Sequence, residues 1–140
     1  METTEFVESL NGDLETEFQS IIQYINHIAL LKGAEYLSII DELKIHLGQE
    51  LTHATVLAEQ VAFLGGEPST RVTAVTPAKS GDDASTALRA DLSLERDQLD
   101  RYRERFAQAN DLGLADVAEA IRPLLEQTQE HVRDLETVVG

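Results

Sequence analysis

Apolar residues recur at steps of three or four positions along four long segments of this 140-residue chain, and this period restricts the fold more than any other feature. The segments predicted to be helical cover about residues 4–32, 34–64, 83–110 and 114–138. A period of this kind gathers the apolar side chains on one face of an α-helix, and no segment competes with it as a β-strand. Four amphipathic helices have to bury those faces against one another, so the sequence predicts an all-α fold.

The breaks between the segments predict how the helices are connected. Gly33 and the stretch Asp111-Leu112-Gly113 are short interruptions, so the helices on either side of each form an antiparallel hairpin. Residues 65–82 have no apolar period, and Asp82 or Asp83 can cap the helix that follows. Fully extended, this loop reaches about 60 Å, whereas a 28-residue helix is about 42 Å long. The prediction is a single domain over residues 1–140, a four-helix bundle whose two hairpins are joined by one long crossover loop.

Two residues inside the helical segments weaken the helix prediction locally. Asn11-Gly12 is a turn signal, although the apolar stripe passes through it without a change of phase. Pro123 lacks a backbone N–H, so it should either kink the last helix or mark its true start.

The composition excludes several classes of function. The chain has no cysteine, which excludes disulfides, thiolate metal sites and iron–sulfur clusters. Its 26 acidic and 11 basic residues give a formal charge of −15, a poor match for nucleic acid or an anionic membrane. Solubility, a high-salt habitat and attraction of cations all fit this charge. No apolar run approaches the ~18 residues of a membrane span, and the acidic N-terminus is unlike a signal peptide, so a cytoplasmic protein is expected.

Each predicted helix carries a possible metal ligand on its apolar face. These residues are Glu17 in the first helix, Glu50 and His53 in the second, Glu95 in the third and His131 in the fourth. Burying a carboxylate without a partner costs several kcal/mol, roughly, and a metal ion is a natural partner. Glu17 and His53 are 36 positions apart, as are Glu95 and His131. Two similar hairpins packed around a pseudo-two-fold axis would bring all five groups to one level of the core, where they suit two metal ions bridged by carboxylates.

Further polar residues on the stripes have simpler explanations. A lone glutamate on a helix usually lies on the solvated face, and a lone core histidine is usually hydrogen-bonded packing. Tyr24 and Tyr102 lie two turns after Glu17 and Glu95, so they are either core aromatics or hydrogen-bond partners of those glutamates. His27 and His46 are expected to be structural or exposed.

At these residues the chain resembles the bacterioferritin branch of the ferritin-like family. The resemblance extends over nearly the whole chain and rests on four stretches: Leu10-Asn11 with Leu14, Glu17, Gln23-Tyr24 and His27; Glu50-Leu51-Thr52-His53-Ala54; Asp91-Leu92-Ser93-Leu94-Glu95; and Glu130-His131-Val132 with Leu135-Glu136. It implies a di-iron ferroxidase site that oxidises Fe(II) with dioxygen or peroxide and, in cage-forming members, stores the product as mineral.

The chain departs from this family pattern in three places. Thr128 stands where the fourth helix of the family has a glutamate, so one carboxylate is missing and Gln127, Glu126, Glu130, a hydroxide or a bound anion would have to complete the site. Leu51 stands where bacterioferritins have their haem-binding methionine, so no haem is predicted. The chain stops at Gly140 without the family's short fifth helix, which puts a closed 24-subunit cage in doubt.

Three hypotheses follow from the sequence. The first is a ferroxidase-type oxidoreductase for iron storage or detoxification, with two iron ions held by the five residues. The second is an enzyme that removes peroxide at two manganese or iron ions, because three glutamates and two histidines also resemble the ligand set of manganese catalases. The third is a helical oligomeric protein whose metal site is degenerate. In each case we expect a homo-oligomer, at least a dimer.

Overall fold

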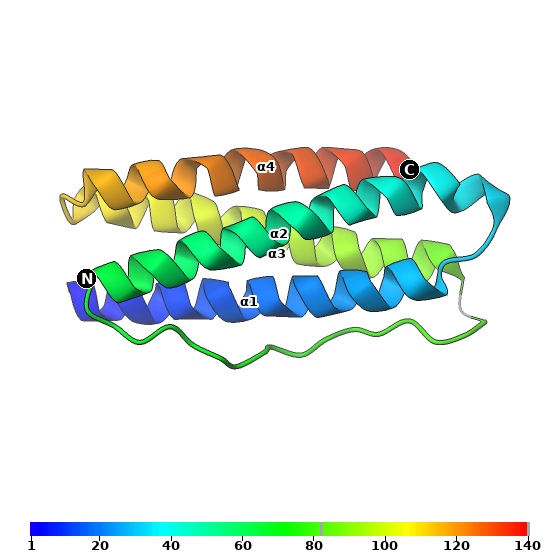
Figure 1. Cartoon of the computed structure of the whole chain (residues 1–140). Coiled ribbons are helices and arrows are strands. Elements are labelled where there is room, and N and C mark those ends of the chain that lie inside the picture. Colours follow the sequence, from blue (N-terminus) through cyan, green and yellow to red (C-terminus); the bar gives the residue numbers. More distant parts are fainter. Residues whose placement is uncertain (82, 140) are drawn as a thin grey trace.

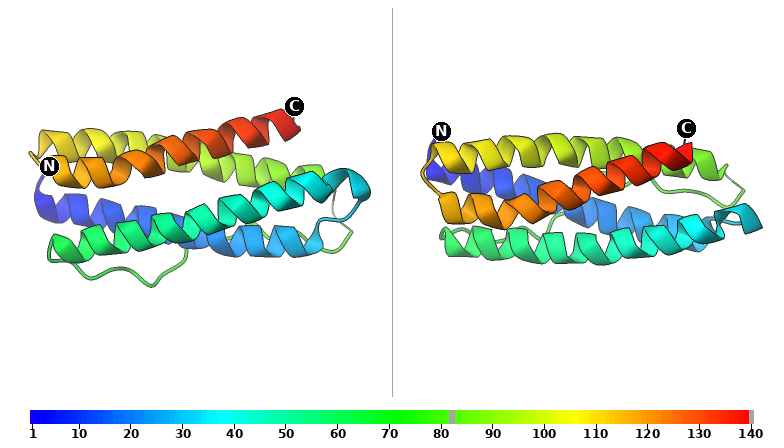
Figure 2. Two further views of the ribbon diagram at one scale, coloured as in Figure 1. Left: turned by 45° about the horizontal axis from the view of Figure 1, so that its top comes forward. Right: turned by 90° about the horizontal axis from the view of Figure 1, so that it is seen from above.

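The fold is a bundle of four long α-helices, seen in a computed structural model that describes residues 1–81 and 83–139 (Figure 1). The helices are α1 (Thr3–Leu30), α2 (Leu37–Phe63), α3 (Ala84–Asp111) and α4 (Ala115–Val139), and a short 3₁₀-helix, η1 (Ala34–Tyr36), precedes α2. Helix α1 packs on α2 and on α3, and α4 packs on α3 and on α2. Two further views show the same side-by-side arrangement of two hairpins (Figure 2). The predicted four-helix bundle with one long crossover is confirmed.

The start of the second helix differs from the sequence prediction, whereas the fourth helix starts close to the predicted residue, before Pro123. The second helix was expected from residue 34, but Ala34–Tyr36 form one 3₁₀ turn, closed by the Tyr36 N–H on the Gly33 carbonyl at 3.0 Å, before α2 starts at Leu37. Helix α4 runs through Pro123, so the proline does not mark its start. The two turns before the proline are held by Val117 and Ile121, both fully buried.

The crossover between α2 and α3 runs the length of α1 (Figure 1), and polar side chains of α1 bind it. The Asn11 side chain donates to the Glu67 carbonyl at 3.0 Å and accepts from the Ser69 N–H at 2.8 Å. Further along, Gln23 accepts from the Thr76 N–H and Asn26 from the Ala78 N–H, at 3.0 and 2.7 Å. Helix α1 is therefore continuous through Asn11-Gly12, and the Asn11 side chain hydrogen-bonds the crossover loop.

The start of α3 has the predicted cap. The Asp83 carboxylate accepts a hydrogen bond from the Ser85 N–H at 3.2 Å, which satisfies one of the free amides of the first turn. Asp82, the alternative cap, lies outside the described residues.

Two apolar clusters fill the bundle, one toward each end. The first holds Phe6, Leu10, Leu14, Leu57, Val61, Val117 and Ile121, and the second holds Leu31, Leu43, Leu88, Leu92, Val132 and Leu135. Between these clusters lies a layer of buried polar side chains. No helix in the part of the chain that the structure describes is long and apolar enough to cross a membrane.

Candidate metal centre

The five residues predicted as metal ligands meet in this polar layer. Glu17 comes from α1, Glu50 and His53 from α2, Glu95 from α3 and His131 from α4, and none is more than 1% exposed. They form two groups, Glu17–Glu50–His53 and Glu50–Glu95–His131, and the ligand atoms within each group lie within 4.8 Å of one another. Glu50 belongs to both groups, so its two oxygens face two neighbouring positions.

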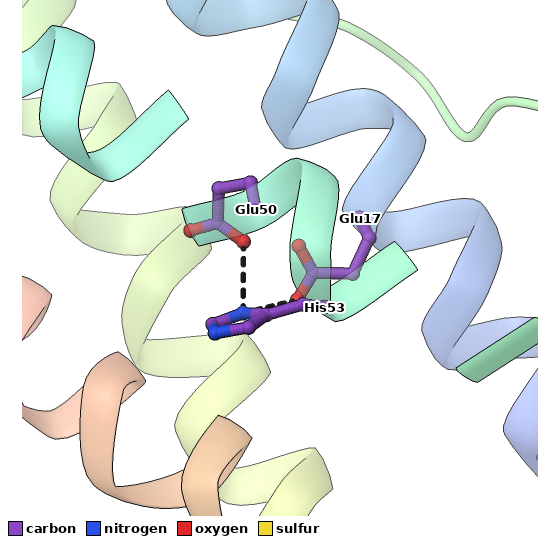
Figure 3. A group of neighbouring side chains, drawn as sticks. All are labelled: Glu17, Glu50 and His53. Atoms are coloured by element: carbon purple, nitrogen blue, oxygen red, sulfur yellow. Dashed lines mark ion pairs between the residues drawn. The ribbon is translucent and has the colours of Figure 1, made fainter. Parts of the chain in front are cut away.

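Each histidine directs Nδ1 at the carboxylates of its own group. His53 Nδ1 lies 3.5 Å from Glu17 Oε1 and 3.4 Å from Glu50 Oε2, as Figure 3 shows. His131 Nδ1 lies 3.0 Å from Glu50 Oε1 and 3.3 Å from Glu95 Oε1. The two halves of the centre therefore have the same arrangement, with one imidazole between two carboxylates.

Two glutamines fix the tautomers of these histidines. His53 Nε2 lies 2.7 Å from Gln127 Oε1, and His131 Nε2 lies 2.5 Å from Gln49 Oε1. An amide oxygen only accepts hydrogen bonds, so each Nε2 carries a hydrogen and each Nδ1 is directed toward the carboxylates. Gln127, which the sequence analysis named as a possible part of the site, contacts His53, whereas sequence reasoning missed Gln49. The repeat could have found it, because Gln49 precedes Glu50 as Gln127 precedes Thr128.

Glu50 and Glu95 differ in their affinity for a proton. Burial raises the pKa of Glu50 well above its usual range, and the nearby Glu17 and Glu95 carboxylates raise it further. Glu50 Oε1 and His131 Nδ1 lie at hydrogen-bond distance, 3.0 Å apart. Burial also raises the pKa of Glu95, but the neighbouring His131, Glu50 and Tyr24 side chains outweigh it and lower that pKa to about 2.

Tyr24 and Tyr102 hydrogen-bond the outer glutamates, which supports the second of the two readings left open by the sequence. Tyr24 Oη donates to Glu95 Oε1 at 2.7 Å, and Tyr102 Oη donates to Glu17 Oε1. Burial, followed by the carboxylates around them, raises the pKa of both phenols well above 10, so both remain neutral donors. Each tyrosine thus orients one glutamate.

One oxygen of every glutamate in the centre has no hydrogen-bond partner among the described residues. These atoms are Glu17 Oε2, Glu50 Oε2 and Glu95 Oε2, and His53 Nδ1 and Thr128 Oγ1 are also unpartnered. Leaving a buried acceptor unsatisfied costs about 1–3 kcal/mol. The three carboxylate oxygens among these atoms accept hydrogen bonds when ionised and cannot donate them, and acceptors that converge without a donor are what a cation site requires. Carboxylate and imidazole donors suit Fe and Mn, so the residues fit a pair of such ions.

Thr128 makes the two halves of the centre differ. Residues 78 positions apart correspond between the two hairpins: Glu17 with Glu95, His53 with His131, Tyr24 with Tyr102, Gln49 with Gln127, and Glu50 with Thr128. Thr128 is fully buried, so the fourth helix brings a hydroxyl to the place where symmetry would put a second shared carboxylate. The centre therefore has three carboxylates and two imidazoles.

His46 and His27 are both buried, so of the two alternatives that the sequence left open for them, structural or exposed, the structure supports the structural one. The ring of His46 stacks on that of His131, with the ring centres 4.0 Å apart, and is 1% exposed. His27 lies at the other side of the polar layer, where its Nδ1 is 2.8 Å from Asp91 Oδ2. Both have structural contacts, and His46 also reaches the metal centre.

Comparison with known proteins identifies the family. A model of the ferritin-like domain matches residues 7–140. The chain belongs to the ferritin-like family. Distant relatives include a bacterioferritin of Brucella melitensis biotype 1, 28% identical over 131 residues that cover 94% of this chain and 80% of that protein.

Solved structures of ferritin-like proteins agree with this membership. A ferritin-like, diiron-carboxylate protein from Bacillus anthracis str. Ames superposes with a TM-score of 0.91 and 25% identity, covering 100% of both chains. A bacterioferritin of Rhodobacter capsulatus, solved with a metal-free dinuclear site and haem iron, superposes with a TM-score of 0.82 and 26% identity, covering 97% of this chain and 84% of that chain. The predicted resemblance to the bacterioferritin branch is confirmed at the level of distant homology.

Proposed function

We propose that this ferritin-like protein binds two iron ions in its polar layer and oxidises Fe(II) with dioxygen or peroxide. The proposed ligands are Glu17, Glu50, His53, Glu95 and His131. The observation that carries the proposal is the convergence of three buried glutamates, each with one unpartnered oxygen among the described residues, with the Nδ1 atoms of two buried histidines. The diiron-carboxylate relative from B. anthracis supports iron as the metal.

The side chains around the ions hold them in fixed positions. Glu17, Glu50 and His53 would hold one ion, Glu50, Glu95 and His131 would hold the other, and Glu50 would have to be ionised to do so. When bound, a pair of Fe(II) ions supplies the two electrons that reduce dioxygen to peroxide or peroxide to water. The hydrogen bonds from Gln49, Gln127 and the two tyrosines would keep the ligands from turning away.

The charge of the site leaves room for the oxidant. Three carboxylates carry −3 against +4 for two divalent ions, so an additional anionic ligand completes the balance. Thr128 is uncharged, and its buried Oγ1 has no hydrogen-bond partner among the described residues, so on this side the protein would supply no further carboxylate and the ions would be open to the oxidant.

Aerobic addition of Fe(II) to the metal-free protein tests the proposal. Two equivalents per chain should be oxidised faster than in buffer, as followed by stopped-flow absorbance in the near ultraviolet. Glu50→Gln should abolish the fast phase, whereas Glu59→Gln, an exposed position on α2, should retain it. Substoichiometric iron binding without oxidation would overturn the proposal and favour a degenerate site.

A peroxide-removing di-manganese enzyme is the second candidate. It is favoured by Thr128, which reduces the ligand set to the three glutamates and two histidines that resemble those of manganese catalases. Metal analysis of the purified protein followed by addition of peroxide separates the two functions. Manganese at two equivalents together with release of dioxygen from peroxide would support this candidate against the first.

We also propose that the protein forms a dimer through the outer face of α1 and α2. Large apolar side chains are exposed on these helices, namely Ile22, Ile25, Leu37, Ile45, Leu51 and Phe63. A shallow groove between the two helices has Phe18, Ile21, Leu51 and Ala58 in its wall. A second copy of the same surface matches such a groove, as two-fold symmetry requires. Sedimentation velocity should give a dimer that Leu51→Lys shifts toward the monomer, and a monomeric wild-type protein would contradict the proposal.

A further inference from the structure

A second cluster of possible metal ligands lies beside the centre, where α2 meets the last turns of α4. It consists of Glu42 and His46 from α2 and Asp134 from α4, with one ligand atom of each within 4.8 Å of the others. The same three residues line one side of a pocket of about 320 Å³ between these helices. The side chains of Glu42 and Asp134 are 46% and 45% exposed, while that of His46 is 1% exposed. The cluster therefore leads from solvent to the interior.

Both ring nitrogens of His46 lie close to polar side chains. Its Nδ1 is 3.4 Å from the hydroxyl of Tyr24, which itself donates to Glu95 at 2.7 Å. The other nitrogen, Nε2, lies toward Asp134 and Glu42.

Two carboxylates surround this Nε2 atom. His46 Nε2 lies 3.1 Å from Asp134 Oδ2 and 3.6 Å from Glu42 Oε1. A hydrogen bond joins His46 and Asp134, and the three possible ligand atoms lie close enough together for one cation to take the place of the shared hydrogen. One imidazole and two carboxylates are donors that Fe(II) and Mn(II) accept, with water completing the coordination.

We propose that Glu42, His46 and Asp134 form a third binding site for a divalent cation. The site is distinct from the two positions of the metal centre, since it shares no ligand with them, but the stacked rings of His46 and His131 connect the two. A cation held here is one imidazole away from the Glu50–Glu95–His131 group. The site is therefore placed to load Fe(II) into the centre, a role that rests on the proposed function.

Titration of the full-length, metal-free protein with Mn(II) tests the site itself. The electron paramagnetic resonance signal of free Mn(II) counts the bound equivalents, and wild-type protein should bind three per chain. The double variant Glu42→Gln/Asp134→Asn should bind two, because both positions are half exposed and can change without loss of folding. Asp41→Asn, an exposed neighbour on α2, is the matched control for lost charge and should bind three. Equal numbers of equivalents in the double variant and the wild type would overturn the third site.

The loading role has a separate readout. With Fe(II) below one equivalent per chain, the double variant should oxidise it several-fold more slowly than the Asp41→Asn control, whereas excess Fe(II) should bring the two rates together. An unchanged rate at low Fe(II) would overturn the loading role. Glu50→Gln separates this inference from the proposed function, because it should lose the central ions and retain the third Mn(II) site.

Discussion

Replacing Glu50 by glutamine should remove the stabilisation by both metal ions while leaving the fold of the metal-free protein unchanged. Glutamine has the shape and hydrogen-bonding capacity of a protonated glutamic acid, and burial raises the pKa of Glu50 so that the folded state favours this protonated form. Its amide can still hydrogen-bond His131 Nδ1, which Glu50 contacts at 3.0 Å. Near pH 4, where glutamic acid also keeps its proton in the unfolded chain, we therefore expect the free energy of unfolding of the metal-free variant to stay within about 0.5 kcal/mol of the wild type.

The expected loss of metal-dependent stabilisation in each variant depends on how many of the two ligand groups contain the replaced residue. An ion at 100 times its dissociation constant stabilises the folded state by about 2.7 kcal/mol, so two ions give about 5 kcal/mol. For a chain of this size 1 kcal/mol corresponds to about 3 °C, so loading should raise the melting temperature of the wild type by about 15 °C. Glu50 belongs to both ligand groups, whereas Glu17 belongs to one. Glu50→Gln should lose nearly the whole increase, and Glu17→Gln should lose about half.

Differential scanning calorimetry with and without Mn(II) provides the measurement, since Mn(II) has the same charge as Fe(II) and resists oxidation by air at neutral pH. Each variant is compared with its own metal-free form, so any change in intrinsic stability cancels. Equal losses in Glu50→Gln and Glu17→Gln would refute the shared position of Glu50. If adding Mn(II) does not change the melting temperature of the wild type, the metal site itself is refuted.

Three further outcomes are expected. Thr128→Glu should supply the second shared carboxylate and tighten binding of the pair about tenfold or more, equivalent to about 1.4 kcal/mol; calorimetric titration measures this, and Thr128→Gln controls for size without charge. Metal binding near pH 7 should release the proton of Glu50, visible as a dependence of the binding enthalpy on the buffer. The metal-free protein should lose stability as the pH rises above about 4.5, because the folded state holds a proton on Glu50 that the unfolded chain has lost. Glu50→Gln should have a flatter pH profile in melting experiments, and an identical profile would contradict the assignment of that proton.

The parts of the molecule that depend on apolar periodicity were predictable from the sequence. A helix of 3.6 residues per turn links sequence spacing to direction, so Glu17, Glu50 and Glu95 could be placed at one level of the core from their positions on the stripes. Their meeting in the structure follows from the same geometry. Their role as ligands remains a prediction.

The parts that depend on irregular backbone or single contacts were not predictable. The 3₁₀ turn at Ala34–Tyr36 is too short to show an apolar period in the sequence. The hydrogen bonds between the crossover and Asn11 and Gln23 depend on the path of a loop that has no apolar period. His46 carried a signal that was passed over, since it lies four positions before Glu50 and so shares its helix face. Its environment depends on Asp134 of another helix, which spacing within α2 could not reveal.

Because the crossover is bound along α1, we expect the two hairpins to stay associated even when the chain between them is cut. Polar side chains of α1 hold the loop by its backbone at several points, so a single proteolytic cut within it would leave both pieces docked in place. The amino-terminal piece would keep Glu17, Glu50 and His53 together, while Glu95 and His131 would depend on Glu50 from the other piece. Metal binding would then strengthen the association of the two fragments, and the increase in their affinity for each other would measure the affinity for the ions.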